Sequence, residues 1–92
     1  MVDFETEVKK SPYIFIIETE CVQDIITRLH IIFTRRRVPV LDFQSVRLND
    51  GDKMRILIIV EESKENILKL YNLVERQVDV MSVNLFESIY QQ

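Results

Sequence analysis

Few side chains in this 92-residue sequence could do chemistry. There is one histidine, His30, and no group of cysteines or carboxylates at metal-ligand spacing accompanies it. A histidine needs partner groups to act as an acid, a base or a ligand. We therefore expect His30 to lie on the surface or at the flank of a helix. The sequence predicts a chain that is not an enzyme and that has no metal site and no cofactor of its own.

The single cysteine, Cys21, permits two interpretations. It could be a reactive thiol at the start of a helix. We favour the second interpretation, a small half-buried residue in a strand-to-helix corner. One cysteine cannot form an intramolecular disulfide, which is typical of a reducing compartment. No apolar run approaches the roughly twenty residues that span a membrane, and the acidic N-terminus does not resemble a signal peptide. We expect a cytoplasmic chain with no membrane partner.

Three consecutive arginines stand within the stretch "FTRRRVPVLDF", residues 33–43, and could contact phosphate. However, the chain has 12 basic and 15 acidic residues and a formal charge of −3, whereas a domain that binds nucleic acid is usually strongly basic. The only glycine, Gly51, excludes a glycine-rich phosphate loop. We therefore predict no nucleic-acid partner.

Hydrophobic periodicity predicts the elements that position these residues. Apolar or alternating runs predict strands over residues 13–17, 40–48, 54–60 and 78–86. Helical spacing predicts helices over residues 22–33 and 64–77. Ser63 should cap the second helix, and "NDGD" at residues 49–52 predicts a hairpin. The alternation slips near Gln44 and Ser45, which indicates a bulge or an edge strand.

The order β-α-β-β-α-β predicts an α+β fold, the ferredoxin-like plait, in which two helices cover one face of a four-stranded antiparallel sheet. We expect a flexible N-terminal arm over residues 1–12, one domain over residues 13–87 and a C-terminal tail over residues 88–92. The strands at 13–17 and 54–60 are apolar on both sides, so a partner or a second copy should cover the other sheet face. Leu57 and Ile59 are the candidate contact residues there.

The same topology occurs in RNA-recognition motifs, which stack bases on aromatic residues of the two central strands. The strand over residues 54–60 contains no aromatic residue. The strand over residues 13–17 has Tyr13 and Phe15, but no basic residues surround them. The sequence therefore disfavours RNA recognition.

Three segments carry a resemblance to a known family: "IIFTRRRVPVLDFQSV", "RILIIVEES" and "LYNLVERQVDVMSVNLFE". Over residues 13–87 the chain resembles the ACT domain of the acetolactate synthase small (regulatory) subunit, of the short single-domain type. The most specific matches are residues 33–36 together with Leu73, Asp79, Val80 and Val83.

The resemblance implies a non-catalytic regulatory subunit that acts in branched-chain amino acid biosynthesis. Such a subunit forms a homodimer or higher homo-oligomer through side-by-side sheets. It binds the thiamine-diphosphate-dependent catalytic subunit of acetolactate synthase, and it can bind a branched-chain amino acid at the dimer interface. Arg35 and Arg36 stand where the family itself has two arginines. Their charges suit the C-terminal end of a helix, and they are further candidates for partner contact.

The family's effector loop has an "ENEPGVL" pattern, where this chain reads "ECVQDII". The resemblance makes five residues candidates for effector binding: Cys21, Val22, Gln23, Asp24 and Ile25. Asp24 replaces a glycine that lets backbone N–H groups approach the effector's carboxylate, and its negative charge would repel that carboxylate. Alternatively, Asp24 caps the first helical turn and favours the helix dipole, which is the interpretation that we favour. Either way, we predict that amino-acid feedback is lost or altered.

Arg37 replaces the family's helix-ending glycine. Either Arg37 adopts a positive φ, or Pro39 ends the helix by another route. Two functional alternatives to the acetolactate synthase subunit stay open. One is a stand-alone ACT domain that senses an amino acid or another small ligand at its dimer interface. The other is a plain interaction module.

Overall fold

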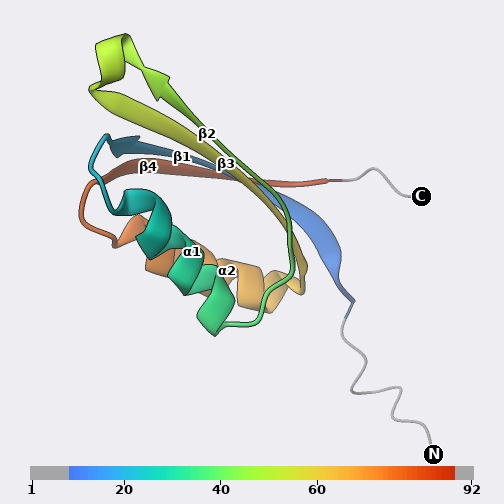
Figure 1. Ribbon diagram of the computed structural model, residues 1–92. Helices are drawn as coiled ribbons and strands as arrows, with labels where there is room; N and C mark the ends of the chain where they lie inside the picture. Colours follow the sequence, from blue (N-terminus) through green and yellow to red (C-terminus); the bar gives the residue numbers. More distant parts are fainter. Residues whose placement is uncertain (1–8, 89–92) are drawn as a thin grey trace, which may run out of the picture.

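The computed structural model describes residues 9–88. The predicted N-terminal arm and C-terminal tail therefore lie mostly outside the described residues. The elements in chain order are β1 (Ser11–Glu20), α1 (Ile25–Arg35), β2 (Val40–Leu48), the short 3-10 turn η2 (Asn49–Gly51), β3 (Lys53–Glu62), α2 (Lys64–Glu75) and β4 (Val80–Glu87). The strands form one antiparallel sheet in the order β2-β3-β1-β4, and both helices cover one face (Figure 1). The predicted ferredoxin-like plait is confirmed.

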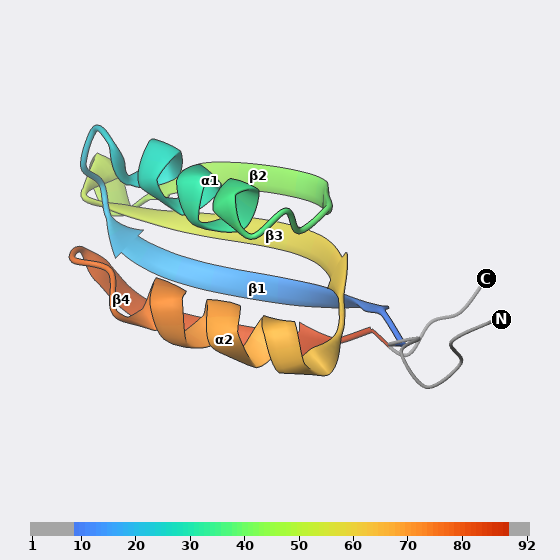
Figure 2. The same cartoon turned by 90° about the horizontal axis from the view of Figure 1, so that it is seen from below.

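Strand β1 is the centre of the sheet. It pairs with β3 without a break from Ser11 opposite Glu62 to Glu20 opposite Lys53, and it pairs with β4 on its other side. Helix α1 lies over β2 and β3, whereas α2 lies over β1 and β4 (Figure 2). Each helix therefore covers one half of the sheet, and β2 and β4 are its two edges.

The core lies between the helices and one face of the sheet. Alternate residues of β1 and β3 are buried there, as the period of a strand requires. Phe15 of β1 and Phe33 of α1 meet edge to face, with ring centroids 5.3 Å apart. The helices bury one stripe each, and its members are Ile25, Leu29, Phe33, Ile67, Leu70 and Val74.

Several element boundaries differ from those predicted. Helix α2 ends at Glu75, two residues earlier than predicted, and β4 begins at Val80, two residues later. Helix α1 begins at Ile25, because Val22 lies in a turn in which its N–H donates to the carbonyl of Glu20. Strands β1 and β3 are longer than predicted, because their ends carry polar residues such as Thr19 and Glu62 that are nevertheless buried. The irregularity in β2 falls between Val40 and Asp42 and not near Gln44, although the predicted edge position is confirmed.

Helix α1 ends without a glycine. Arg37 has a φ of 57°, in the left-handed region. Its N–H donates to the carbonyl of Thr34 at 2.9 Å, and the N–H of Val38 donates to Phe33 at 3.2 Å. This pair of bonds is the Schellman motif, and the burial of both Val38 and Phe33 supplies its usual apolar contact. The first of the two predicted helix endings is therefore confirmed.

Candidate functional site

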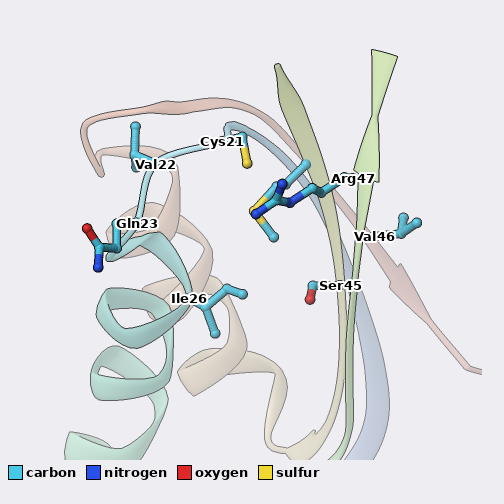
Figure 3. Close-up of a pocket in the computed structure, with 8 residues that line it drawn as sticks. Cys21, Val22, Gln23, Ile26, Ser45, Val46 and Arg47 are labelled. Atoms are coloured by element: carbon cyan, nitrogen blue, oxygen red, sulfur yellow. The ribbon is translucent and has the colours of Figure 1, made fainter. Parts of the chain in front are cut away.

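An open cleft of about 610 Å³ lies between the start of α1 and the edge strand β2 (Figure 3). Its walls come from the turn between β1 and α1, from the first turn of α1, and from β2 and β3. The lining residues are Cys21, Val22, Gln23, Ile26, Ser45, Val46, Arg47 and Met54. Three of the five effector-binding candidates, Cys21, Val22 and Gln23, are among them.

Only some of these side chains point into the cleft. The Cys21 sulfur and the Ile26 side chain face it from the α1 side, and Ser45 and Arg47 face it from β2 (Figure 3). Gln23 and Val46 point away from the space that the others enclose. Cys21 is a free, half-buried cysteine in the corner between strand and helix, which agrees with the interpretation that we favoured.

The structure does not bring the other two candidates to the cleft. Ile25 is completely buried in the core. Asp24 is the residue before α1, but its side chain makes no capping hydrogen bond, so the predicted cap is wrong. Its carboxylate is 70% exposed and lies 3.3 Å from the guanidinium of Arg28, one helical turn onward. The ion pair to Arg28 holds the carboxylate away from the N–H groups that a cap would satisfy.

Arg28 links the start of α1 to the loop that precedes β4. Its guanidinium donates to the carboxylate of Asp79 at 2.7 Å and to the carbonyl of Val78 at 3.1 Å. The hydrogen bond to Asp79, more than the charges of Asp79 and Asp24, raises the pKa of Arg28. Asp79 itself has a φ of 80°, and its carbonyl accepts the N–H of Glu20 at 2.8 Å. The back of the β1–α1 turn is therefore fixed in place.

Arg47 is the residue of the cleft that sequence reasoning missed. It lies directly opposite Met54 of β3, on the same face of the sheet as Ser45. The alternation of β2 was the available signal, because it places Ser45 and Arg47 on the face that looks toward α1. Next to the cleft, the buried hydroxyl of Thr19 has no hydrogen-bond partner in the described residues, and Thr19 also lies opposite Met54.

The uncovered face of the sheet carries the contact candidates Leu57 and Ile59. The strand register places them beside Ile16 and Ile14 of β1, and all four are half-buried. Phe86 of β4, opposite Ile14, is 51% exposed. At one end of this apolar strip, Arg55 and Glu18 form an ion pair of 3.0 Å. No helix of the described residues covers this face (Figure 1).

Arg35 and Arg36, the other contact candidates, are exposed and lie at a second hollow, between the two helices. This groove of about 570 Å³ is also lined by apolar and amide side chains, namely Ile31, Ile32, Asn66, Leu73 and Gln77. His30 lies on the exposed side of α1 and stacks on Phe43 of β2, with ring centroids 4.2 Å apart. The predicted surface position of His30 is confirmed.

No three histidine, cysteine or acidic side chains between residues 9 and 88 are grouped as a metal site would require. Within the same residues, no helix has the length and apolar character needed to cross a membrane.

No protein-family model matches the sequence, and no curated protein sequence matches it. Solved structures do match. An uncharacterized protein from Thermotoga maritima, TM1266, is similar with a TM-score of 0.72 and 14% identity, over 86% of this chain and 98% of that one. The ACT domain from GTP pyrophosphokinase of Chlorobium tepidum is similar with a TM-score of 0.72 and 8% identity, over 85% of this chain and 100% of that domain.

A third match is the C-terminal domain of the MgtC protein from Mycobacterium tuberculosis. Its TM-score is 0.70 at 13% identity, over 100% of this chain and 98% of that domain. At such identities a likeness carries the fold and nothing finer. The chain therefore has the ferredoxin-like fold of ACT domains.

Proposed function

We propose that this chain is a non-catalytic regulatory domain that binds a small ligand in the cleft between α1 and β2. The observation that carries the proposal is the position of the cleft, which joins the β1–α1 turn to the edge strand. A ligand there contacts two elements that a second copy or a partner can reach at the edge of the sheet. Ligand binding can then change how the domain assembles.

More specifically, we propose that the chain acts as a small subunit of acetolactate synthase and binds the catalytic subunit of that enzyme. Support comes from the resemblance over residues 13–87, whose most specific matches include residues 33–36 and Asp79. Asp79 is the residue that Arg28 holds at the back of the β1–α1 turn. The stand-alone sensor is the alternative, and it needs only the cleft.

Assembly is part of the proposal. The strip formed by Ile14, Ile16, Leu57 and Ile59 is apolar and uncovered, so a second copy or the catalytic subunit should lie against it. Ile59→Asp puts a charge in the middle of the strip and should weaken assembly. Leu68→Asp is the matched control, because Leu68 is an exposed aliphatic residue of α2, away from the uncovered face of the sheet. Light scattering that gives the same oligomer for Ile59→Asp and the wild type would refute the contact.

The test of the function is co-expression with an acetolactate synthase catalytic subunit from the same organism. We expect the chain to co-purify with the catalytic subunit and to change its rate of acetolactate formation. The Ile59→Asp variant distinguishes the surfaces, because its failure to co-purify would assign the partner to the strip. A catalytic subunit that neither co-purifies nor changes in activity would rule out the acetolactate synthase proposal and leave the stand-alone sensor.

A further inference from the structure

We propose that the cleft selects a short aliphatic monocarboxylate that carries no ammonium group, and that the Arg47 guanidinium binds its carboxylate. The inference rests on the proposed function, because it names the ligand class of the same cleft. It assigns Arg47 as the residue that determines this selectivity.

The charges of the cleft favour an anion. Among the described residues that line it, Arg47 is the only one with a charge. Three acidic residues lie close to the cleft without lining it. Glu20 pairs with Lys53 at 3.6 Å, Asp24 pairs with Arg28 at 3.3 Å, and Asp52 is exposed, with its backbone carbonyl accepting the N–H of Cys21 at 3.0 Å. The described residues that line the cleft therefore offer a cation to a ligand's carboxylate and no carboxylate to its ammonium group.

Arg47 is available to a ligand. Arg28 and Arg55 each form an ion pair with a carboxylate, whereas the Arg47 side chain has no hydrogen bond or ion pair within the described residues. One of its terminal nitrogens lies beside Gly51, 3.9 Å from where a Cβ would stand. From there the guanidinium extends across the cleft toward Cys21 (Figure 3). A guanidinium matches the two oxygens of a carboxylate better than any other side chain does.

Part of the cleft wall can contact an aliphatic chain. Ile26 and Met54 are apolar, and the Cys21 thiol behaves as a small apolar group. The hydroxyl of Ser45 points into the same space and can bond to one polar atom of the ligand (Figure 3). The volume of about 610 Å³ lies within the range of small-molecule sites.

Three commercial compounds isolate the two charges of the ligand. 4-Methylpentanoate and leucine differ only in the ammonium group, and 3-methylbutylamine is leucine without its carboxylate. Each is titrated calorimetrically into the purified full chain. We expect 4-methylpentanoate to bind, leucine to bind at least tenfold more weakly, and 3-methylbutylamine not to bind.

The Arg47→Gln variant tests the role of the guanidinium. Loss of a hydrogen-bonded charge pair should weaken the binding of 4-methylpentanoate by roughly 10- to 100-fold. Arg36→Gln is the matched control, because it removes the same charge at the far end of α1, outside the cleft. Circular dichroism and thermal unfolding of both variants show whether they remain folded. Arg47→Lys keeps the positive charge but cannot bind both carboxylate oxygens as a guanidinium does, so it separates these two contributions.

The titrations test the selectivity and the ligand class separately. If leucine binds as tightly as 4-methylpentanoate, or if Arg47→Gln binds as well as Arg36→Gln, the selectivity is wrong while ligand sensing stands. If none of the three compounds binds, the ligand class is overturned. Co-purification with the catalytic subunit then decides separately whether the regulatory role survives.

Discussion

The two β-α-β units of this plait are built differently. In the second unit, the side chain of Ser63 accepts the N–H of Asn66 at 3.3 Å and caps α2. Beside it, the buried carboxylate of Glu62 accepts a hydrogen bond from the Asn66 amide at 3.0 Å. In the first unit, Asp24 leaves α1 without a side-chain cap. An open cleft separates the start of α1 from β2, which is mostly exposed.

The difference indicates a division of roles. The second unit satisfies its polar groups internally and packs α2 against β4 and β1, so it contributes stability. Within the described residues, the first unit has an open cleft with the unpaired Arg47 in its wall, which is a feature of a surface that binds a ligand.

The largest effect should come from the core of the second unit. Ile67 is completely buried on the inner face of α2, so Ile67→Ala removes packed methyl groups and leaves a cavity. We expect a loss of about 2 to 5 kcal/mol in the free energy of unfolding, measured with urea. Ile26→Ala in the wall of the cleft is the comparison, and it should cost about 1 kcal/mol because Ile26 is only partly buried. Equal losses at the two positions would contradict the division.

The two helix starts give the next comparison. Ser63→Ala removes a side-chain cap and should cost about 1 kcal/mol in the free energy of unfolding. Asp24→Ala removes no cap, so its effect should stay within about 0.5 kcal/mol, as for an ordinary exposed residue. The same urea titration measures both. A larger loss at Asp24 than at Ser63 would show that α1 depends on its acidic residue after all.

The end of α1 should accept a glycine. Glycine has no Cβ atom and adopts the left-handed backbone of position 37 without strain. Arg37→Gly should therefore stabilise the chain by about 1 kcal/mol. Arg36→Gly is the matched control, because Arg36 has a φ of −91° and gains nothing from glycine. Thermal unfolding measures both. If both variants lose stability equally, the Schellman ending is not what holds this turn.

Acid should weaken the second unit through Glu62. Burial would raise the pKa of this carboxyl, but the hydrogen bonds from Asn66 and Ser63 and the charge of Lys10 together lower it below its usual value. A lowered pKa in the folded state gives stability that is present above the unfolded pKa and is lost as the pH falls through the folded pKa.

The measurement is urea unfolding of the wild type and of Glu62→Gln at neutral pH and near pH 3. We expect the variant to be less stable at neutral pH and the difference to shrink in acid. A difference that is the same at both pH values would mean that the Glu62 charge contributes nothing.

Much of the fold could be predicted from the sequence, because the apolar period of β1, β3 and the helices follows from which faces are buried. The bounds of β2 were predicted as observed. The ends of β1 and β3 were not, since buried polar residues such as Thr19 do not look like strand interior. The left-handed Arg37 could be anticipated only because a known family has glycine at its position.

The site was less predictable. Resemblance pointed to the β1–α1 turn, and three of its five candidates do line the cleft. Arg47 lies 24 residues or more from those candidates, so only the pairing of β2 with β3 brings it there. From its position alone, Asp24 could either cap the first turn of α1 or form an ion pair with Arg28, four residues onward. The sequence does not decide between the two.

The most direct test of the account follows backbone amide shifts of the isotope-labelled chain during titration with 4-methylpentanoate. If the cleft binds this ligand, the largest shifts should fall at residues 21–26 and 45–47, around the cleft. Residues 62–76, in the second unit, should change little. The largest shifts in α2 or on the uncovered sheet face, or no shifts at millimolar ligand, would contradict the account.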